Sequence, residues 1–108
     1  MAEHLLIETR GTWDGPGCER LAGDAVALAS AGHGVGVLLL ENGVTAALPG
    51  AVSALEQLAR GGDAVWVDEF SWRQRGMTGA ELIAGARFVD TDAVAEKLMD
   101  PDVRVLWR

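Results

Sequence analysis

The sequence of 108 residues predicts a three-layer, doubly wound α/β domain on a mainly parallel five-stranded sheet. Strand-like apolar runs alternate with amphipathic helical patterns along the whole chain, and the connections between them are short. Gly34 to Leu40, GVGVLLL, is apolar on both faces, which is typical of a parallel strand covered by helices on both sides. Because parallel neighbours need crossover helices of one hand, the alternation predicts helices on both faces of a single sheet.

The N-terminal segments predict a strand, a loop, a helix and a second strand. Leu5 to Thr9 is a short apolar and β-branched run, which favours the first strand. Three glycines, an aspartate and a proline in Gly11 to Gly17, GTWDGPG, predict a loop. From Cys18 to Ala31 apolar residues recur at helical spacing, so we expect an amphipathic helix that Gly32 ends. Gly34 to Leu40 is then the second strand.

The middle of the chain predicts a second helix and a third strand. Ala51 to Arg60 follows a Pro-Gly pair, carries one apolar face and is stopped by Gly61 and Gly62, so we expect a helix there. Ala64 to Val67 is the third strand. Further on, a Thr-x-x-Glu capping box at Thr78 predicts a short helix that runs to about residue 86.

The C-terminal part predicts a strand, a helix and a final strand. Arg87 to Val89 can form a very short fourth strand, and Asp90 to Asp92 supplies the N-cap of a helix closed by Pro101. Val103 to Trp107 is the last strand. The helix is expected to use four apolar residues, Val94, Ala95, Leu98 and Met99.

This succession of elements favours a flavodoxin-like arrangement, in which ligands gather at the carboxyl ends of the strands. That edge should collect three loops, Gly11 to Gly17, Glu41 to Val44, and Asp68 to Met77. The candidate ligand residues of the first two loops are Asp14, Glu41, Asn42 and Gly43.

Composition excludes several classes of protein. The formal net charge is -7, and phosphate binding draws on clustered Lys and Arg, so we expect no direct contact with nucleic acid. One cysteine with two separated histidines gives neither a disulfide nor a zinc-site spacing, so we expect no metal and no cofactor. The longest apolar run is far below the roughly 20 residues of a membrane span, and the N-terminus lacks a secretory pattern. We therefore expect a single cytoplasmic domain over residues 1–108, with no membrane partner.

The stretch Val65 to Gly79, VWVDEFSWRQRGMTG, concentrates charged and aromatic residues at the end of a strand. Its acids and arginines could form a general acid–base pair with an anion clamp, a solvated turn, or a contact with another subunit. The contact interpretation is supported by two large aromatic side chains, because aromatics and arginine are enriched in interface cores. The side chains concerned are Asp68, Glu69, Phe70, Trp72, Arg73 and Arg75. Gly76 is expected to adopt a positive φ.

Two further features permit alternative chemistry. Cys18 lies at the first turn of a helix, where free N–H groups and the helix dipole favour a thiolate. The loop GTWDGPG could cradle an anion before that helix, although it matches neither GxGxxG nor the Walker pattern. His33 is expected to be a residue of the helix-to-strand turn.

Three segments in the second two thirds of the chain carry a family resemblance. Leu38 to Gly50, LLLENGVTAALPG, is an apolar strand followed by an acid–amide pair, Gly-Val and two alanines. Val65 to Gly79 is the next strand with an acidic, apolar turn and an Arg-Gly pair, and Asp90 to Trp107 is a final helix and a strand ending in tryptophan. Together they resemble the DsrE/DsrF/DsrH (TusBCD-like) sulfur-relay family, most closely its DsrH/TusB branch. The N-terminal third is more similar to the catalytic DsrE-type relatives.

The resemblance implies that Asp68 occupies the family's sulfur-acceptor position. In the catalytic relatives a cysteine eight positions before the glycine of Arg-Gly accepts sulfur as a persulfide, and counting back from Gly76 gives Asp68. A carboxylate cannot carry sulfane sulfur, because that chemistry needs a thiolate. The DsrH/TusB branch also lacks this cysteine and is the partner subunit that completes a ring-like or hetero-oligomeric assembly.

The leading hypothesis is therefore a non-catalytic or weakly catalytic subunit of a sulfur-relay assembly that acts in tRNA thiolation or sulfur oxidation. Its expected partners are further copies or sister DsrE/DsrF-type subunits, together with a downstream sulfur carrier protein. The expected interface residues are Phe70, Trp72, Arg73, Arg75, Gly76 and Trp107. One alternative is a stand-alone homo-oligomeric carrier that uses Cys18, and another is a flavodoxin-like module that binds a small anion or nucleotide.

Overall fold

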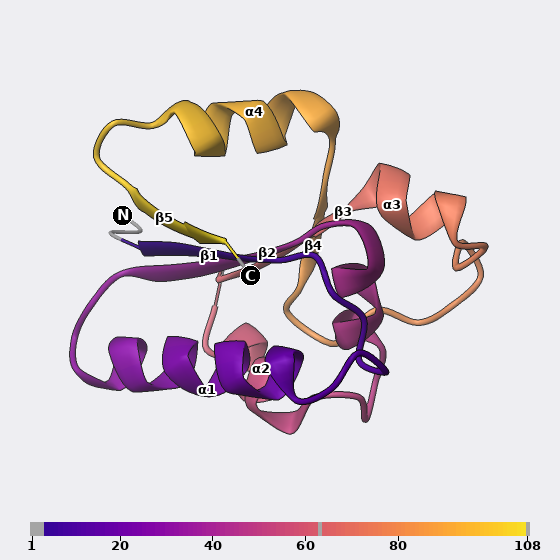
Figure 1. Cartoon of the computed structure of the whole chain (residues 1–108), viewed down its shortest axis with the longest axis horizontal. Helices are drawn as coiled ribbons and strands as arrows, with labels where there is room; N and C mark the ends of the chain where they lie inside the picture. The colour runs from indigo at the N-terminus through magenta and orange to yellow at the C-terminus, as the bar shows by residue number, and fades with distance from the viewer. Residues whose placement is uncertain (1–3, 63, 108) are drawn as a thin grey trace.

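The computed structural model describes residues 4–62 and 64–107, which form one α/β unit around a five-stranded sheet (Figure 1). All neighbouring strands are parallel and their order is β4-β3-β2-β1-β5. The parallel five-stranded sheet predicted from the sequence is confirmed. The strands are β1 (His4–Glu8), β2 (Val35–Leu39), β3 (Val65–Asp68), β4 (Arg87–Val89) and β5 (Arg104–Trp107).

Helices cover both faces of the sheet, as the doubly wound prediction requires (Figure 1). α1 (Gly17–Ser30) and α2 (Ser53–Arg60) lie side by side on one face, and α4 (Thr91–Met99) crosses the other face between β4 and β5. A 3-10 helix, η1 (Glu41–Ala47), and the short α3 (Glu69–Gln74) lie beyond the carboxyl ends of β2 and β3. Of the described helices, none is long and apolar enough to cross a membrane.

The two faces of the sheet differ in how well they are packed. On the α1 and α2 side, inward residues of β1 to β3 meet both helices, η1, Trp72 and Ile83 in one buried cluster. On the α4 side the fully buried residues are Leu5, Ile7 and Leu38, over which Val94 and Leu98 pack while staying partly exposed. The α4 layer is therefore the thinner cover.

Two helix boundaries follow the signals in the sequence. Gly32 has φ of 90° and follows the C-terminus of α1, a conformation that glycine adopts without strain. The Asp90 side chain accepts a hydrogen bond of 2.8 Å from the Ala93 N–H and caps α4. His33 lies in the connection from α1 to β2, as expected.

One helix was placed wrongly from the sequence. Residues 78–86 form turns and irregular segments, and the helix of this region is α3, at 69–74. α3 starts earlier because Asp68 accepts a hydrogen bond from the Ser71 N–H and caps it directly after β3. The later segment instead binds η1, since the N–H of buried Ile83 donates to the Ala47 carbonyl at 3.0 Å.

The prediction of which residues form the apolar face of α4 is confirmed only in part. Val94 and Leu98 pack on the sheet, whereas Ala95 is exposed and Met99 is 82% exposed. Met99 is the last residue of the helix, and Val94 and Leu98 are one helical turn apart and already occupy the inward position.

Candidate functional site

The carboxyl ends of β1, β2 and β3 bring three acidic residues to one edge of the sheet. Glu8 is the last residue of β1, Glu41 follows β2, and Asp68 is the last residue of β3. Glu8 and Asp68 are buried, whereas Glu41 is exposed and has a φ of 52°, which is unusual for a residue other than glycine. This edge was expected to hold the functional residues, and the structure places most candidates along it.

Glu8 is a buried carboxylate that the sequence reasoning missed. It is only 1% exposed, and its Oε2 accepts hydrogen bonds from the N–H groups of Thr9 and Arg10 at 3.0 and 3.1 Å. Its Oε1 is also buried and has no hydrogen-bond partner among the described residues. The available signal was an acid at the end of the apolar run HLLI, directly before the glycine loop.

The setting of Cys18 disfavours the thiolate that its place at a helix start permitted as an alternative. Its Sγ is buried and donates to the Arg10 carbonyl oxygen at 3.2 Å. Burial, followed by the negative charges of Glu8, Asp14 and Glu19, raises the pKa of Cys18 from 9.0 to about 11. Desolvation and three carboxylates therefore outweigh the helix dipole, and the group is a protonated thiol at neutral pH.

The glycine loop after β1 has already used several of the backbone donors that could hold an anion. Asp14 Oδ2 accepts from the Gly11 N–H at 2.9 Å, and the Thr12 N–H donates to Thr45 Oγ1 at 3.2 Å. Glu8 accepts from the two N–H groups just upstream, so four consecutive backbone N–H groups are hydrogen-bonded to side chains of the protein itself. Trp13 is 65% exposed, and its ring lies over Gly11.

The ends of β2 and β3 are joined by a second polar network. Asp68 Oδ2 accepts from Ser71 N–H at 3.2 Å and from Ser71 Oγ at 2.5 Å, and Ser71 Oγ in turn accepts from the Glu41 N–H at 2.9 Å. Arg75 adds a second tie, because its Nε donates to Asn42 Oδ1 at 2.8 Å and its Nη1 to the Ser71 carbonyl at 3.1 Å. Ser71 was missed, although Asp68 is a favoured N-cap residue and its side chain would be expected to accept from an N–H two or three positions later.

The structure separates the expected interface residues into exposed and internal groups. Trp72 was expected to be exposed, and that is wrong: it is 2% exposed, and its ring meets Phe88 edge-on at a centroid distance of 5.4 Å. α3 turns Trp72 to the core and Phe70 to the surface, which the expected loop would not have done. Gly76 has the expected positive φ, of 70°. Phe70, Arg73 and Trp107 are exposed, and Arg75 is half-buried.

A cavity of about 430 Å³ opens beside Asp68 on the α4 side of this edge. It lies between the end of β2, α3 and the first turn of α4. Leu40, Phe70 and Val94 supply its apolar lining, and its polar lining consists of Glu41, Asp68, Ser71, Gln74 and Thr91. The position that the family resemblance assigned to the sulfur acceptor therefore faces a space that a small group can enter.

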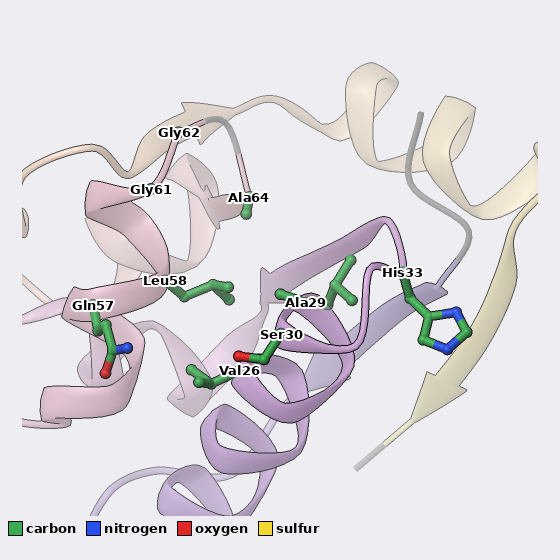
Figure 2. Close-up of a pocket in the computed structure, with 10 residues that line it drawn as sticks. Val26, Ala29, Ser30, His33, Gln57, Leu58, Gly61, Gly62 and Ala64 are labelled. Atoms are coloured by element: carbon green, nitrogen blue, oxygen red, sulfur yellow. The ribbon is translucent and has the colours of Figure 1, made fainter.

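A second cavity, of about 370 Å³, lies at the opposite, amino edge of the sheet between the ends of α1 and α2 (Figure 2). Val26, Ala29 and Leu58 supply apolar lining, and Figure 2 shows the His33 ring turned away from Leu58. That ring meets His4 edge-on at a centroid distance of 5.3 Å. In the described part of the chain, no group of three or more His, Cys, Asp or Glu side chains is arranged to hold a metal ion.

The five-stranded parallel sheet with helices on both faces is a doubly wound, flavodoxin-like α/β architecture, and the fold is DsrE-like. Among solved structures, the YchN protein of E. coli matches with a TM-score of 0.80 over 100% of both chains, at 19% sequence identity. That likeness establishes the fold. No protein-family model matches the sequence, and no curated protein matches it significantly.

Proposed function

We propose that this chain is a subunit of a sulfur-relay assembly of the DsrH/TusB type, in which persulfide sulfur is carried on other subunits. The observation that carries the proposal is the place of Asp68, the residue that the family resemblance assigns to the acceptor position, in the lining of the carboxyl-edge cavity. Its carboxylate is held by Ser71 and has no sulfur chemistry, so the chain can complete the site of an assembly but cannot accept sulfur there. The DsrE-like fold supports the proposal.

The environment of Cys18 argues against the alternative of a stand-alone sulfur carrier. A thiol whose pKa is raised to about 11 offers roughly a thousandth of its population as thiolate at pH 8. To act as the nucleophile in persulfide transfer, the Cys18 Sγ would also have to leave the core, because Cys18 is 4% exposed and its Sγ is hydrogen-bonded to the Arg10 carbonyl oxygen. A carrier cysteine needs the opposite setting, an accessible group of low pKa.

The closed glycine loop argues against the alternative of an anion or nucleotide module. The N–H groups of Thr9, Arg10, Gly11 and Thr12 all donate to side chains of the chain itself. The Arg75 guanidinium, which contacts the loop after β2, is hydrogen-bonded to Asn42 and Ser71. An arriving phosphate would have to displace these internal acceptors.

Assembly is proposed to use the exposed apolar side chains at the two outer parts of the sheet. Phe70 and Phe88 are 53% and 42% exposed near β4, and Leu106 and Trp107 are 49% and 58% exposed on β5. An open sheet with apolar groups at both edges offers two different surfaces, which suits contacts with copies or sister subunits on either side. Arg73, exposed on α3, adds a charged contact beside Phe70.

Association measured by analytical ultracentrifugation tests this proposal, with the chain alone and mixed with sister DsrE/DsrF-type subunits. Phe70→Ala and Trp107→Ala should each weaken association by roughly tenfold or more, since aromatic anchors dominate interfaces. Met99→Ala is the control, because it removes an even more exposed apolar side chain, at the end of α4. A strictly monomeric chain in both settings, or variants that assemble as well as the control, would contradict the proposal.

A further inference from the structure

The cavity at the carboxyl edge has an unbalanced charge. Two of its lining residues, Glu41 and Asp68, carry carboxylates, and none of the described lining residues carries a positive charge. Ser71, Gln74 and Thr91 add oxygen atoms that can accept hydrogen bonds. A ligand that fits this lining therefore carries hydrogen-bond donors and a positive charge.

Asp68 is the group for which this imbalance matters most. Its side chain is 8% exposed, and both of its hydrogen bonds within the described chain are accepted by Oδ2, from the N–H and the hydroxyl of Ser71. Among residues 4–62 and 64–107 no Lys, Arg or His forms an ion pair with it. A buried carboxylate without a counter-charge is costly, and a cation entering the cavity would relieve that cost.

The rest of the cavity fits the stem of such a cation. Leu40 and Val94 come from two different elements, the residue after β2 and the first turn of α4, and Phe70 adds an exposed aromatic ring to the lining. Aliphatic walls accommodate methylene groups, and an aromatic face beside a cation adds attraction. The volume of about 430 Å³ is in the range of small-molecule sites.

An anion is a poorer fit for the same space. α4 begins at this cavity, but its first turn is already capped by the Asp90 carboxylate, which accepts from the Ala93 N–H. Arg75 lies in the neighbouring network, where its guanidinium is bonded to Asn42 and Ser71 and is not part of the described lining. An entering anion would meet Asp68 and Glu41 with no compensating charge.

We propose that this cavity binds a cationic group on a short aliphatic stem, an alkylammonium or alkylguanidinium, with Asp68 as its buried counter-charge and Leu40 and Val94 packing on the stem. This chemistry is shared by free amines and by the Lys or Arg side chain of a partner protein. The inference goes beyond the relay role and does not depend on it, because it rests on the lining of the cavity alone.

The test is a titration of the full chain, labelled with ¹⁵N, with n-butylammonium and n-butylguanidinium chloride at constant ionic strength. Saturable shifts are expected at the amide signals of Glu41, Ser71 and Val94. n-Butanol, which has the stem without the charge, should produce no saturable shifts. Shifts that stay linear with both cations, or that n-butanol reproduces, would overturn the proposal.

Substitutions locate the binding in this cavity. Asp68→Asn should weaken the binding of both cations at least about tenfold, because the negative charge is lost. It should preserve α3, because Asn caps helices as well as Asp does. Glu96→Gln removes the same charge from an exposed position of α4 and should change the affinity less than about twofold. If Asp68→Asn binds as tightly as Glu96→Gln, the proposal is wrong.

A second variant keeps the test decisive if Asp68→Asn fails to fold. Gln74 is exposed and lines the cavity, so Gln74→Lys places a tethered cation there and should abolish binding of the free cations. Unchanged binding would contradict the proposed location. A capped arginine, N-acetyl-arginine methylamide, distinguishes the sources: if it binds like n-butylguanidinium, a partner's side chain can reach the cavity, and if only the free ions bind, the ligand is a small amine.

Discussion

β1 and β3 deliver comparable groups to the same edge of the sheet, yet the structure treats the two strand ends differently. At the end of β1, Glu8 is covered by its own loop and accepts hydrogen bonds from two backbone N–H groups. At the end of β3, Asp68 caps a helix and borders an open cavity. The buried carboxylate of Glu8 therefore holds a loop closed, whereas that of Asp68 borders a space that another group can enter.

The difference arises from the segment that leaves each strand. After β1 the chain turns back through glycine residues, so its backbone N–H groups donate hydrogen bonds to the carboxylates of Glu8 and Asp14. After β3 the chain enters α3 at once, so Asp68 accepts both of its hydrogen bonds from Ser71 and still lines the cavity. Two strand ends with similar residues can thus differ in whether they form a binding site. The first turn after each strand determines whether the carboxylate at its end stays accessible.

The largest expected effect concerns Glu8. Glu8→Ala should lower the free energy of unfolding by about 3 kcal/mol, because it leaves the N–H groups of Thr9 and Arg10 without their acceptor and opens a cavity at a fully buried position. Chemical denaturation measures the loss, with Glu81→Ala in an exposed turn as the control. A change below about 0.5 kcal/mol, the usual limit for surface substitutions, would show that Glu8 does not hold the loop.

A smaller loss is expected at the other strand end. Asp68→Ala removes the cap of α3 and should cost about 1 to 2 kcal/mol, whereas Asp68→Asn should stay within about 0.5 kcal/mol, because Asn can also accept from the Ser71 N–H. The same denaturation series gives both values. Equal losses at Glu8 and Asp68 would remove the contrast between a closed and an open strand end.

The smallest effect is a pH dependence from Cys18, whose pKa is raised from 9.0 to about 11 in the folded chain. Below pH 9 the thiol is protonated in both states, and between pH 9 and 11 the unfolded chain ionises first, so stability should fall as pH rises through that window. At pH 10 the loss should be about 1 kcal/mol. Few other groups titrate there, because the sequence has no tyrosine and a single lysine.

Cys18→Ala is the control for that dependence. The variant should keep its stability between pH 9 and 11 better than the parent chain, as read from denaturation midpoints at each pH. If both chains lose the same stability, Cys18 is not shielded by burial and by the neighbouring acids, and the loop after β1 is more open than described.

Much of the fold could be predicted because its signals are local. The two-faced apolar run of β2, the glycine after α1 and the Asp90 cap each determine one boundary without reference to the rest of the chain. The helix after β3 could not be located in this way, since Asp68 and Thr78 both offer capping signals in sequence. Burial of Trp72 and the bond from Ile83 to η1 decide between them, and both are tertiary contacts.

The site was predicted in position but not in detail. Parallel strands bring their carboxyl ends together, so the edge, Asp68 and Asn42 were expected there. The role of Glu8 depends on a turn that brings two backbone N–H groups back to its carboxylate, and that of Ser71 on a hydrogen bond from the Glu41 N–H across two loops. The state of Cys18 depends on its burial and on the charges around it. Spacing along the chain does not reveal burial or long-range contacts of this kind.

The most direct test of the central claim is intact-protein mass spectrometry after incubation with a persulfide donor. The chain should acquire no stoichiometric sulfur, because Asp68 lacks a thiol and Cys18 is buried with a raised pKa. Asp68→Cys restores a thiol beside the cavity and should take up persulfide under the same conditions, which shows that the donor is competent. Stoichiometric persulfide on the parent chain, abolished by Cys18→Ala, would contradict the account.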